Sequence, residues 1–197
     1  MWDTGFAPGT SPNASKVGIG DRLKELKVTP EQVKYVGISH FHGDHTGQLA
    51  PFTNATLLIG KGDWEQITSP TPMQGVNVAG FKNWMDEKRK VEPLAFDKDV
   101  FGDGRVIILR TPGHTPGHSS LLVRLKDMGP VLLTGDLAHF RENYESGGVP
   151  SFNFDRAATI ASIERMKQIA ANLKAAVVIQ HDMRDTGKLP AFPAAAK

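Results

Sequence analysis

The stretch His40-Phe41-His42-Gly43-Asp44-His45 places three histidines and one aspartate within six residues. It follows the β-prone residues 35 to 39, so we expect a loop at the carboxyl end of a strand. Imidazole nitrogens and carboxylate oxygens are ligands that zinc and similar metals accept. The alternatives, a loop of solvated histidines or an expression tag, fit poorly with an interleaved cluster in mid-chain. The stretch therefore predicts a metal site.

Length and composition are those of an ordinary globular domain. The chain has 197 residues, of which 40% are hydrophobic and 22% charged, and we expect one domain over residues 1–197. The net charge of +2 gives no reason to expect a nucleic-acid or membrane partner, and the basic run at residues 88–90 is typical of a solvated face. The chain lacks cysteine, which excludes disulfides, thiolate ligands and a cysteine nucleophile.

Hydrophobic patterning predicts a mixed α/β fold. We expect strands at residues 35–39, 55–59, 105–110, 119–125, 131–133 and 176–179. Helices are expected at residues 21–27, 63–67 and 155–173, with a further helix start capped by Thr29. The clearest helix, 155–173, carries an apolar stripe of Ile160, Ile163, Ile169 and Leu173, with Met166 between them. Residues 68–100 read as an irregular segment with one helix that covers a site.

Four β-prone runs each end in a histidine or an aspartate. These residues are the cluster from His40 onward, His114, Asp136 and His181. Strand ends at one edge of a sheet converge in space, and ligands on such rigid ends are held in place. The pattern favours one shared metal site built from segments far apart in the chain.

The ordered motifs carry a family resemblance. His40-x-His42-x-Asp44-His45, Thr-Pro-Gly-His114, Leu-Thr-Gly-Asp136 and His181-Asp182 together resemble the metal-binding set of the metallo-β-lactamase superfamily of hydrolases. Residues 111–118 and 135–143 are similar to the branch that contains N-acyl homoserine lactonases and organophosphate-hydrolase-like enzymes. The matching region runs from residue 3 to about residue 182.

The resemblance implies a four-layer αββα sandwich with two metal ions, expected to be Zn²⁺. It assigns one metal to His40, His42 and His114, the other to Asp44, His45 and His181, and makes Asp136 the bridge. A bridging hydroxide, available near neutral pH because metals lower the pKa of bound water to about 7, would attack an ester or lactone carbonyl. Asp44 is expected to orient that hydroxide.

Three further polar residues have open roles. His118 is expected to be a donor behind the ligands or a packed histidine rather than a ligand. His139 stands where the lactonase branch often has tyrosine, and is either a hydrogen-bond donor to an oxyanion or a pocket wall. Asp182 is either a support for His181 or a solvated loop acid. The aromatic residues Trp64, Phe81, Trp84 and Phe140 are expected in the core.

The N-terminus departs from the family pattern. The resemblance implies two or more strands before the segment Trp2-Asp3-Thr4-Gly5, with which this chain begins. Missing strands would expose a sheet edge, so we expect poor solubility or oligomerisation, for instance a homodimer. The N-terminus shows no signal peptide and no run is long enough to span a bilayer, which suggests a cytoplasmic protein.

The sequence leaves several functions open on this fold. The first is a two-metal hydrolase of a small molecule, with N-acyl homoserine lactones the first candidates and aryl esters the second. Thioesters and phosphotriesters are alternative substrates. A persulfide-dioxygenase-like enzyme with one iron is the second class, and a binding module that kept its ligands is the third. The presence of Asp44, His45 and His181 favours two metals and hydrolysis.

Overall fold

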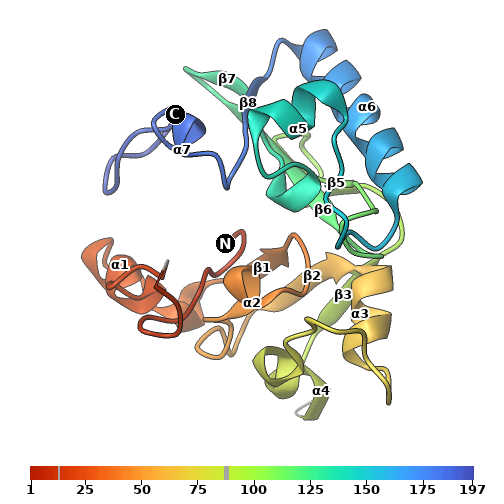
Figure 1. Ribbon diagram of the computed structural model, residues 1–197. Helices are drawn as coiled ribbons and strands as arrows, with labels where there is room; N and C mark the ends of the chain where they lie inside the picture. Colours follow the sequence, from red (N-terminus) through yellow and green to blue (C-terminus); the bar gives the residue numbers. More distant parts are fainter. Residues whose placement is uncertain (13, 87–88) are drawn as a thin grey trace. The chain divides into compact units, whose positions relative to one another are not determined.

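The computed structural model describes residues 1–12, 14–86 and 89–197, and Lys88 of the basic run lies outside them. The chain forms two compact units, Met1–Pro93 and Leu94–Lys197. Each contains a sheet and helices, as predicted for a mixed α/β fold (Figure 1). The single domain over residues 1–197 stays a prediction.

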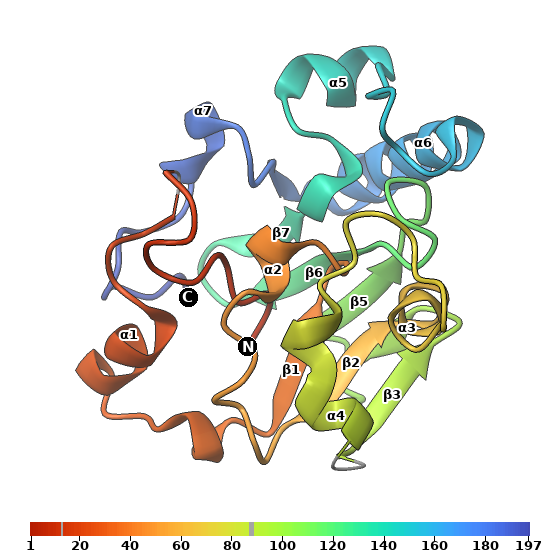
Figure 2. The same cartoon turned by 60° about the horizontal axis from the view of Figure 1, so that its bottom comes forward.

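The first unit is built on a three-stranded sheet with the order β1-β2-β3. Strands β1 (Tyr35–Ile38) and β2 (Thr56–Gly60) are parallel, and β3 (Val91–Leu94) completes the sheet. Helices α1 (Ile19–Glu25), α2 (Gly43–Thr46), α3 (Lys61–Ile67) and α4 (Lys82–Asp86) surround it, with 3-10 turns η1 (Pro30–Gln32) and η2 (Val78–Phe81) (Figure 2). The capping box predicted at Thr29 is present, since the Thr29 N–H donates to Gln32 Oε1 at 2.8 Å.

The core of the first unit fixes the direction of β1. Val36 and Ile38 of β1 pack with Leu57 and Ile59 of β2, and all four side chains are buried. Ile67 of α3 and the aromatic residues Phe81 and Trp84 close the same core, and Trp64 packs against it. β1 is buried along most of its length and ends at Ile38, so the cluster from His40 onward begins directly beyond the end of this strand.

The second unit contains a five-stranded sheet with the order β4-β5-β6-β7-β8. Its strands are β4 (Lys98–Asp99), β5 (Val106–Arg110), β6 (Ser119–Leu125), β7 (Gly129–Leu133) and β8 (Ala176–Val178). β6 is antiparallel to both β5 and β7, and β8 is parallel to β7. Strands β5, β7 and β8 therefore run in one direction, and their carboxyl ends lie at one edge of the sheet.

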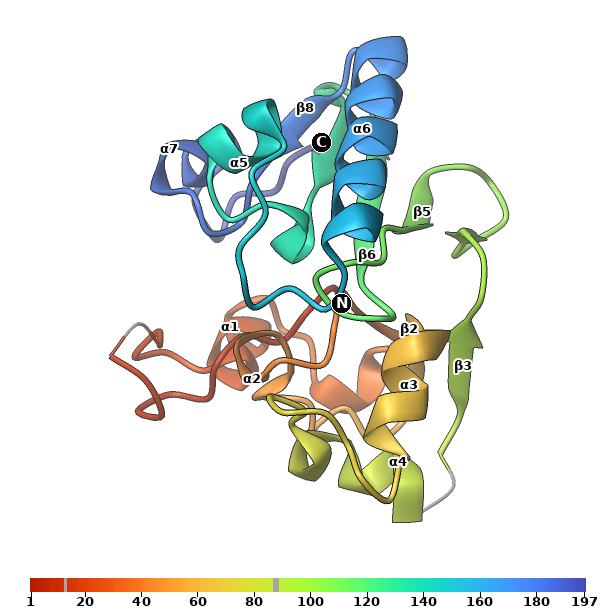
Figure 3. The same cartoon turned by 45° about the vertical axis from the view of Figure 1, so that its right-hand side comes forward.

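Helix α6 (Arg156–Leu173) covers one face of this sheet (Figure 3). Ile163 and Met166 of the predicted stripe are buried against Leu109, Leu122 and Leu132, while the flanking stripe residues are partly buried. The helix begins after Asp155, whose carboxylate accepts from the Ala158 N–H at 2.9 Å. The predicted start and apolar face of this helix are both confirmed.

Short elements account for what the prediction omitted. Residues 68–100 hold β3 and β4 as well as η2 and α4, so one helix in an irregular segment was an incomplete description. Helices α5 (Arg141–Ser146) and α7 (Met183–Thr186) and the turn η3 (Gly135–Leu137) were not predicted either. Elements this short gain their stability from tertiary contacts, which periodicity does not register. Within the described parts of the chain, no helix has the length and apolarity needed to cross a membrane.

Candidate active site

The predicted cluster begins directly beyond the carboxyl end of β1. His40 is fully buried, and His42 directly precedes the short helix α2, which carries Asp44 and His45. The His40 Nε2 and His42 Nδ1 atoms are 2.9 Å apart, and the ring centroids of His40 and His45 are 4.2 Å apart. Asp44 Oδ2 lies 3.4 Å from His45 Nε2. The first unit thus gathers all four members of the cluster.

An aspartate that the sequence did not single out orients His45. Asp3 Oδ2 accepts from His45 Nδ1 at 2.9 Å, and Asp3 Oδ1 accepts from the Ser39 N–H at 2.7 Å. The Ser39 hydroxyl lies 3.0 Å from His40 Nδ1. A carboxylate on the Nδ1 side fixes the ring and its tautomer, an arrangement common behind metal-ligating histidines. Asp3 belongs to the segment Trp2-Asp3-Thr4-Gly5, where the family resemblance begins.

Part of the irregular segment 68–100 lies against the cluster, as predicted. The Asn77 N–H donates to Phe41 O at 3.4 Å, and Asn77 Nδ2 donates to Thr46 Oγ1 at 3.0 Å. Gly75 has a φ of +89°, and a Cβ there would stand 3.1 Å from His42 Nε2. The backbone therefore passes so close to His42 that a side chain at position 75 would press on the ring.

The second unit brings together the other predicted residues at the carboxyl edge of its sheet. His114 follows β5, Asp136 follows β7 and His181 follows β8. Asp136 Oδ2 lies 3.6 Å from His114 Nε2, and Asp136 Oδ1 lies 3.0 Å from His181 Nε2. Asp136 and His114 are buried, whereas His181 is exposed. The convergence expected from strand ends is present for these three residues.

The loop before α6 holds His114. Asn153 Oδ1 accepts from His114 Nδ1 at 3.0 Å, and the Phe154 N–H donates to His114 O at 3.1 Å. Asn153 Nδ2 in turn donates to Thr159 Oγ1 at 3.2 Å. A proton on Nδ1 leaves Nε2 as the atom that faces Asp136. Sequence reasoning missed Asn153 because a single asparagine in a loop has no distinctive spacing.

His118 supports Asp136 from inside the sheet. The ring is fully buried; its Nδ1 donates to Thr111 O at 3.0 Å and its Nε2 accepts from the Asp136 N–H at 3.0 Å. With one nitrogen donating and the other accepting, the ring is neutral. Of the two roles expected for His118, these contacts fit the one in which it supports the candidate ligands from behind. Gly135, with a φ of +57°, lies so close that a Cβ would stand 2.8 Å from His118 Nε2.

His139 lies beside the same carboxylate. Its Nε2 is 3.3 Å from Asp136 Oδ2, and its ring stacks on that of His181 with centroids 5.6 Å apart. The buried Nδ1 has no hydrogen-bond partner among the described residues. A buried polar atom without a partner is costly unless a ligand satisfies it. The other nitrogen of His139, Nε2, lies beside Asp136 and is placed to contact whatever binds at that carboxylate.

Asp182 has a structural role, and the reading of it as a solvated loop acid is wrong. Its buried carboxylate caps α7 by accepting from the Arg184 N–H at 3.0 Å, and also accepts from the Arg141 N–H at 3.0 Å. The Arg184 side chain lowers the pKa of Asp182 well below its usual range. These bonds tie the start of α5, next to His139, to the segment that follows His181.

The aromatic residues divide between core and surface. Phe81 and Trp84 are buried and Trp64 packs against their core, as predicted. Phe140 is exposed, so its assignment to the core was wrong. The reason is its place as the residue before α5, where the chain leaves the sheet edge.

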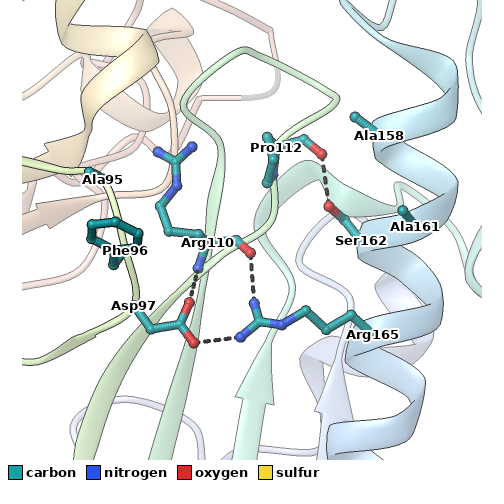
Figure 4. Close-up of a pocket in the computed structure, with 9 residues that line it drawn as sticks. All are labelled: Ala95, Phe96, Asp97, Arg110, Pro112, Ala158, Ala161, Ser162 and Arg165. Atoms are coloured by element: carbon teal, nitrogen blue, oxygen red, sulfur yellow. Dashed lines mark hydrogen bonds and ion pairs between the residues drawn. The ribbon is translucent and has the colours of Figure 1, made fainter.

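A separate pocket of the second unit contains none of the predicted ligands. It has a volume of about 670 Å³ and is lined by Ala95, Phe96, Asp97, Arg110, Pro112, Ala158, Ala161, Ser162 and Arg165 (Figure 4). Arg165 donates to Arg110 O at 2.8 Å and to Asp97 Oδ2, and Ser162 donates to Pro112 O at 2.8 Å. These bonds join α6 to the end of β5 beside the pocket.

The donor set in the second unit suits a divalent metal. In the second unit, ligand atoms of His114, Asp136 and His139 all lie within 4.8 Å of one another. Imidazoles with a fixed tautomer beside a buried carboxylate are the usual environment of zinc and related ions. The residues present thus fit a divalent metal site.

Comparison with known proteins agrees with these features. The model of the family described as the metallo-beta-lactamase superfamily matches residues 1–181. The chain belongs to the metallo-β-lactamase superfamily. The family predicted from the motifs and the mixed α/β fold predicted from the hydrophobic pattern are therefore confirmed.

The relatives point to the lactonase branch within this superfamily. The chain is 36% identical over 171 residues to N-acyl homoserine lactonase AttM of Rhizobium radiobacter, a match that covers 84% of this chain and 64% of the relative. It is 32% identical over 175 residues to an N-acyl homoserine lactonase of a Bacillus species, again over 64% of the relative. The chain thus spans somewhat less than two thirds of the length of these curated relatives.

Solved structures show the same likeness. A variant of AiiA from B. thuringiensis, with N-decanoyl-L-homoserine bound at its active site, has a TM-score of 0.82 at 26% identity over 98% of this chain and 80% of that chain. An N-acyl homoserine lactone hydrolase with N-hexanoyl-L-homoserine at its catalytic metal center gives the same TM-score, identity and coverage.

Proposed function

We propose that this protein is a metal-dependent hydrolase that opens a lactone or cleaves a simple ester, with N-acyl homoserine lactones as the first candidate substrates. The observation that carries the proposal is the meeting of His114, Asp136 and His181 at three strand ends, with the His40 to His45 cluster at a fourth. The similarity to N-acyl homoserine lactonases supports the choice of substrate.

We propose that seven residues of the chain bind two Zn²⁺ ions. One ion would be held by His40, His42 and His114, the other by Asp44, His45 and His181, and Asp136 would bridge them. The chemistry of the donors supports zinc, because imidazole and carboxylate ligands together suit it. Bound zinc would supply an activated water and polarise the oxygen of the scissile group.

Residues of the chain would orient the water, stabilise the oxyanion and hold the ligand rings. Asp44, on the first turn of α2, would orient the attacking water through its carboxylate. His139 would donate a hydrogen bond to the oxyanion as it develops, and its contact with Asp136 keeps the ring at that position. Asp3 and Asn153 would keep two ligand rings in one tautomer.

Hydrolysis assays on the zinc-loaded protein test this proposal. We expect turnover of N-acyl homoserine lactones, and in His42→Ala or Asp136→Ala a loss of activity together with reduced zinc by elemental analysis. Asp127→Ala, which changes an exposed aspartate, serves as the control and should keep both the activity and the zinc content of the wild type. His139→Phe should lower kcat and His139→Tyr should restore part of it. Full activity in His42→Ala or Asp136→Ala would contradict the proposal.

Elemental analysis also separates the iron alternative. One iron per chain with oxygen uptake on a persulfide would identify a dioxygenase, whereas about two zinc ions per chain with lactone or ester turnover would identify the hydrolase. The donors Asp44, His45 and His181 favour the second outcome. Thioesters, phosphotriesters and β-lactams belong in the same screen.

Partners and location remain proposals as well. We propose a homodimer, which light scattering tests, and a cytoplasmic location, which cell fractionation tests. The small net charge of +2 supports the absence of nucleic-acid and membrane partners.

A further inference from the structure

Phe152 lies in the loop between α5 and α6, against two histidines of the candidate site. Its ring makes edge contacts with His139, at a centroid distance of 5.5 Å, and with His114, at 6.0 Å. Both contacts are nearly perpendicular, with interplanar angles of 83°. Despite these contacts the residue is 68% exposed. One part of the ring therefore faces the histidines while the rest is open to an incoming molecule.

Hydrogen bonds on either side hold this ring in place. The next residue, Asn153, binds His114 through its side chain and donates its N–H to Pro150 O at 3.2 Å. The Phe154 and Asp155 N–H groups donate to His114 O and Gly113 O at 3.1 and 2.9 Å. A loop anchored to the residue it covers gives Phe152 a defined position next to His114.

The surroundings of Phe152 favour an apolar ligand. Residues 147–154, which form the loop up to the capping residue Asp155, contain no charged residue and include two exposed phenylalanines, Phe152 and Phe154. A polar or charged substituent would find no partner of opposite charge in this segment. A hydrocarbon chain, by contrast, gains free energy by covering an exposed ring.

We propose that Phe152 is a specificity-determining residue that binds the apolar chain attached to the scissile group, so that the enzyme prefers longer acyl chains. This inference rests on the proposed function. The contacts with His114 and His139 place the ring within one side chain of the reacting centre. A chain that leaves the carbonyl would meet this ring first and gain more contact as it lengthens.

The expected size of the effect follows from the area covered. Full burial of one methylene strengthens binding by about fourfold. Contact on one side of the chain gives roughly half of that free energy, about twofold per methylene. Hexanoyl and decanoyl chains differ by four methylenes, so Phe152 should favour the longer chain by about sixteenfold.

The test compares kcat/KM of the zinc-loaded wild type and Phe152→Ala on homoserine lactones with butanoyl, hexanoyl and decanoyl chains. In the variant we expect the preference for the decanoyl over the hexanoyl substrate to fall by about sixteenfold, mainly through KM. The butanoyl substrate should lose less than about twofold. Phe101→Ala is the matched control. Phe101 is 58% exposed and precedes the amino end of β5, whereas His114 follows the carboxyl end. This control should keep the wild-type dependence on chain length.

The outcomes separate this inference from the proposed function. An equal loss of kcat/KM on all chain lengths in Phe152→Ala would show a structural role for Phe152 and overturn the inference. An unchanged dependence of kcat/KM on chain length would also overturn it, while the proposed lactone hydrolysis would stand. If the wild type opens no lactone, the proposed substrate fails. In that case N-decanoyl-L-homoserine is titrated into both zinc-loaded proteins by calorimetry. Weaker binding to Phe152→Ala supports the inference, and equal or absent binding overturns it.

Discussion

Replacement of Gly113 by alanine tests how the fold holds His114. Gly113 has a φ of +138°, a conformation that residues with a Cβ rarely adopt. A Cβ there would lie 2.4 Å from Thr159 N and 2.6 Å from Thr159 Cα, which are backbone atoms of α6. The backbone strain costs about 1–3 kcal/mol. The overlap with the helix costs roughly another 1–3 kcal/mol.

The two contributions together predict that Gly113→Ala lowers the free energy of unfolding by about 4 kcal/mol. For a chain of this size, each kcal/mol lowers Tm by roughly 2–4 °C, so Tm should fall by about 12 °C. Because His114 is the next residue, zinc affinity should fall as well. Calorimetry of the wild type and the variant, with and without zinc, measures both effects.

Gly147→Ala provides the matched control. Gly147 ends α5 with a φ of +72°, but no atom outside its neighbours lies within 4 Å of the position a Cβ would take. Only the left-handed backbone is then penalised, by about 1 kcal/mol, or roughly 3 °C. Equal losses in the two variants would refute the reasoning, since the close approach of α6 to Gly113 would then carry no cost.

Two further predictions concern the polar residues around the site. Asp3→Asn should weaken zinc binding by about 10–100-fold in a chelator competition, because His45 loses the carboxylate on its Nδ1 side, and unchanged affinity would contradict this role. Arg184 hydrogen-bonds Glu142 and lowers its pKa to about 2, and it lowers the pKa of Asp182 as well. A group whose pKa is lower in the folded than in the unfolded state stabilises the fold at pH values above its unfolded pKa. It loses this effect as the pH falls through its folded pKa. Arg184→Gln should therefore have a lower Tm than wild type at pH 7, and the gap should close between about pH 4 and pH 2; a gap independent of pH would exclude these pairs as the cause.

The elements that carry the candidate ligands were predictable because each combines two local signals. A buried strand shows as a run of apolar residues, and its end shows as a histidine or an aspartate directly after that run. The prediction for residues 119–125 coincides with β6, and the one for 155–173 begins at the residue that caps α6. The direction of β5, β7 and β8 was not readable from these runs, yet it decides that their three ligands share an edge.

The supporting residues were less predictable because their partners are remote in sequence. Asp3 binds a histidine 42 positions away, and Asn153 binds one 39 positions away. A single aspartate or asparagine in a loop carries no periodicity and no motif. Its role depends on which strand end the fold brings beside it, and that depends on the packing of whole elements rather than on neighbouring residues.

The repeated motif Thr-Pro-Gly-His-Thr-Pro-Gly-His illustrates how topology separates two identical residues. His114 lies in the turn after β5, beyond the sheet edge, where its ring reaches Asp136. His118 comes directly before β6, and its O accepts from the Thr111 N–H at 3.0 Å, which continues the pairing of β5 with β6. Its ring is therefore buried beside the sheet, where Nε2 accepts a hydrogen bond from the Asp136 N–H. One histidine thus faces the Asp136 carboxylate at the sheet edge, while the other positions the backbone of the same aspartate.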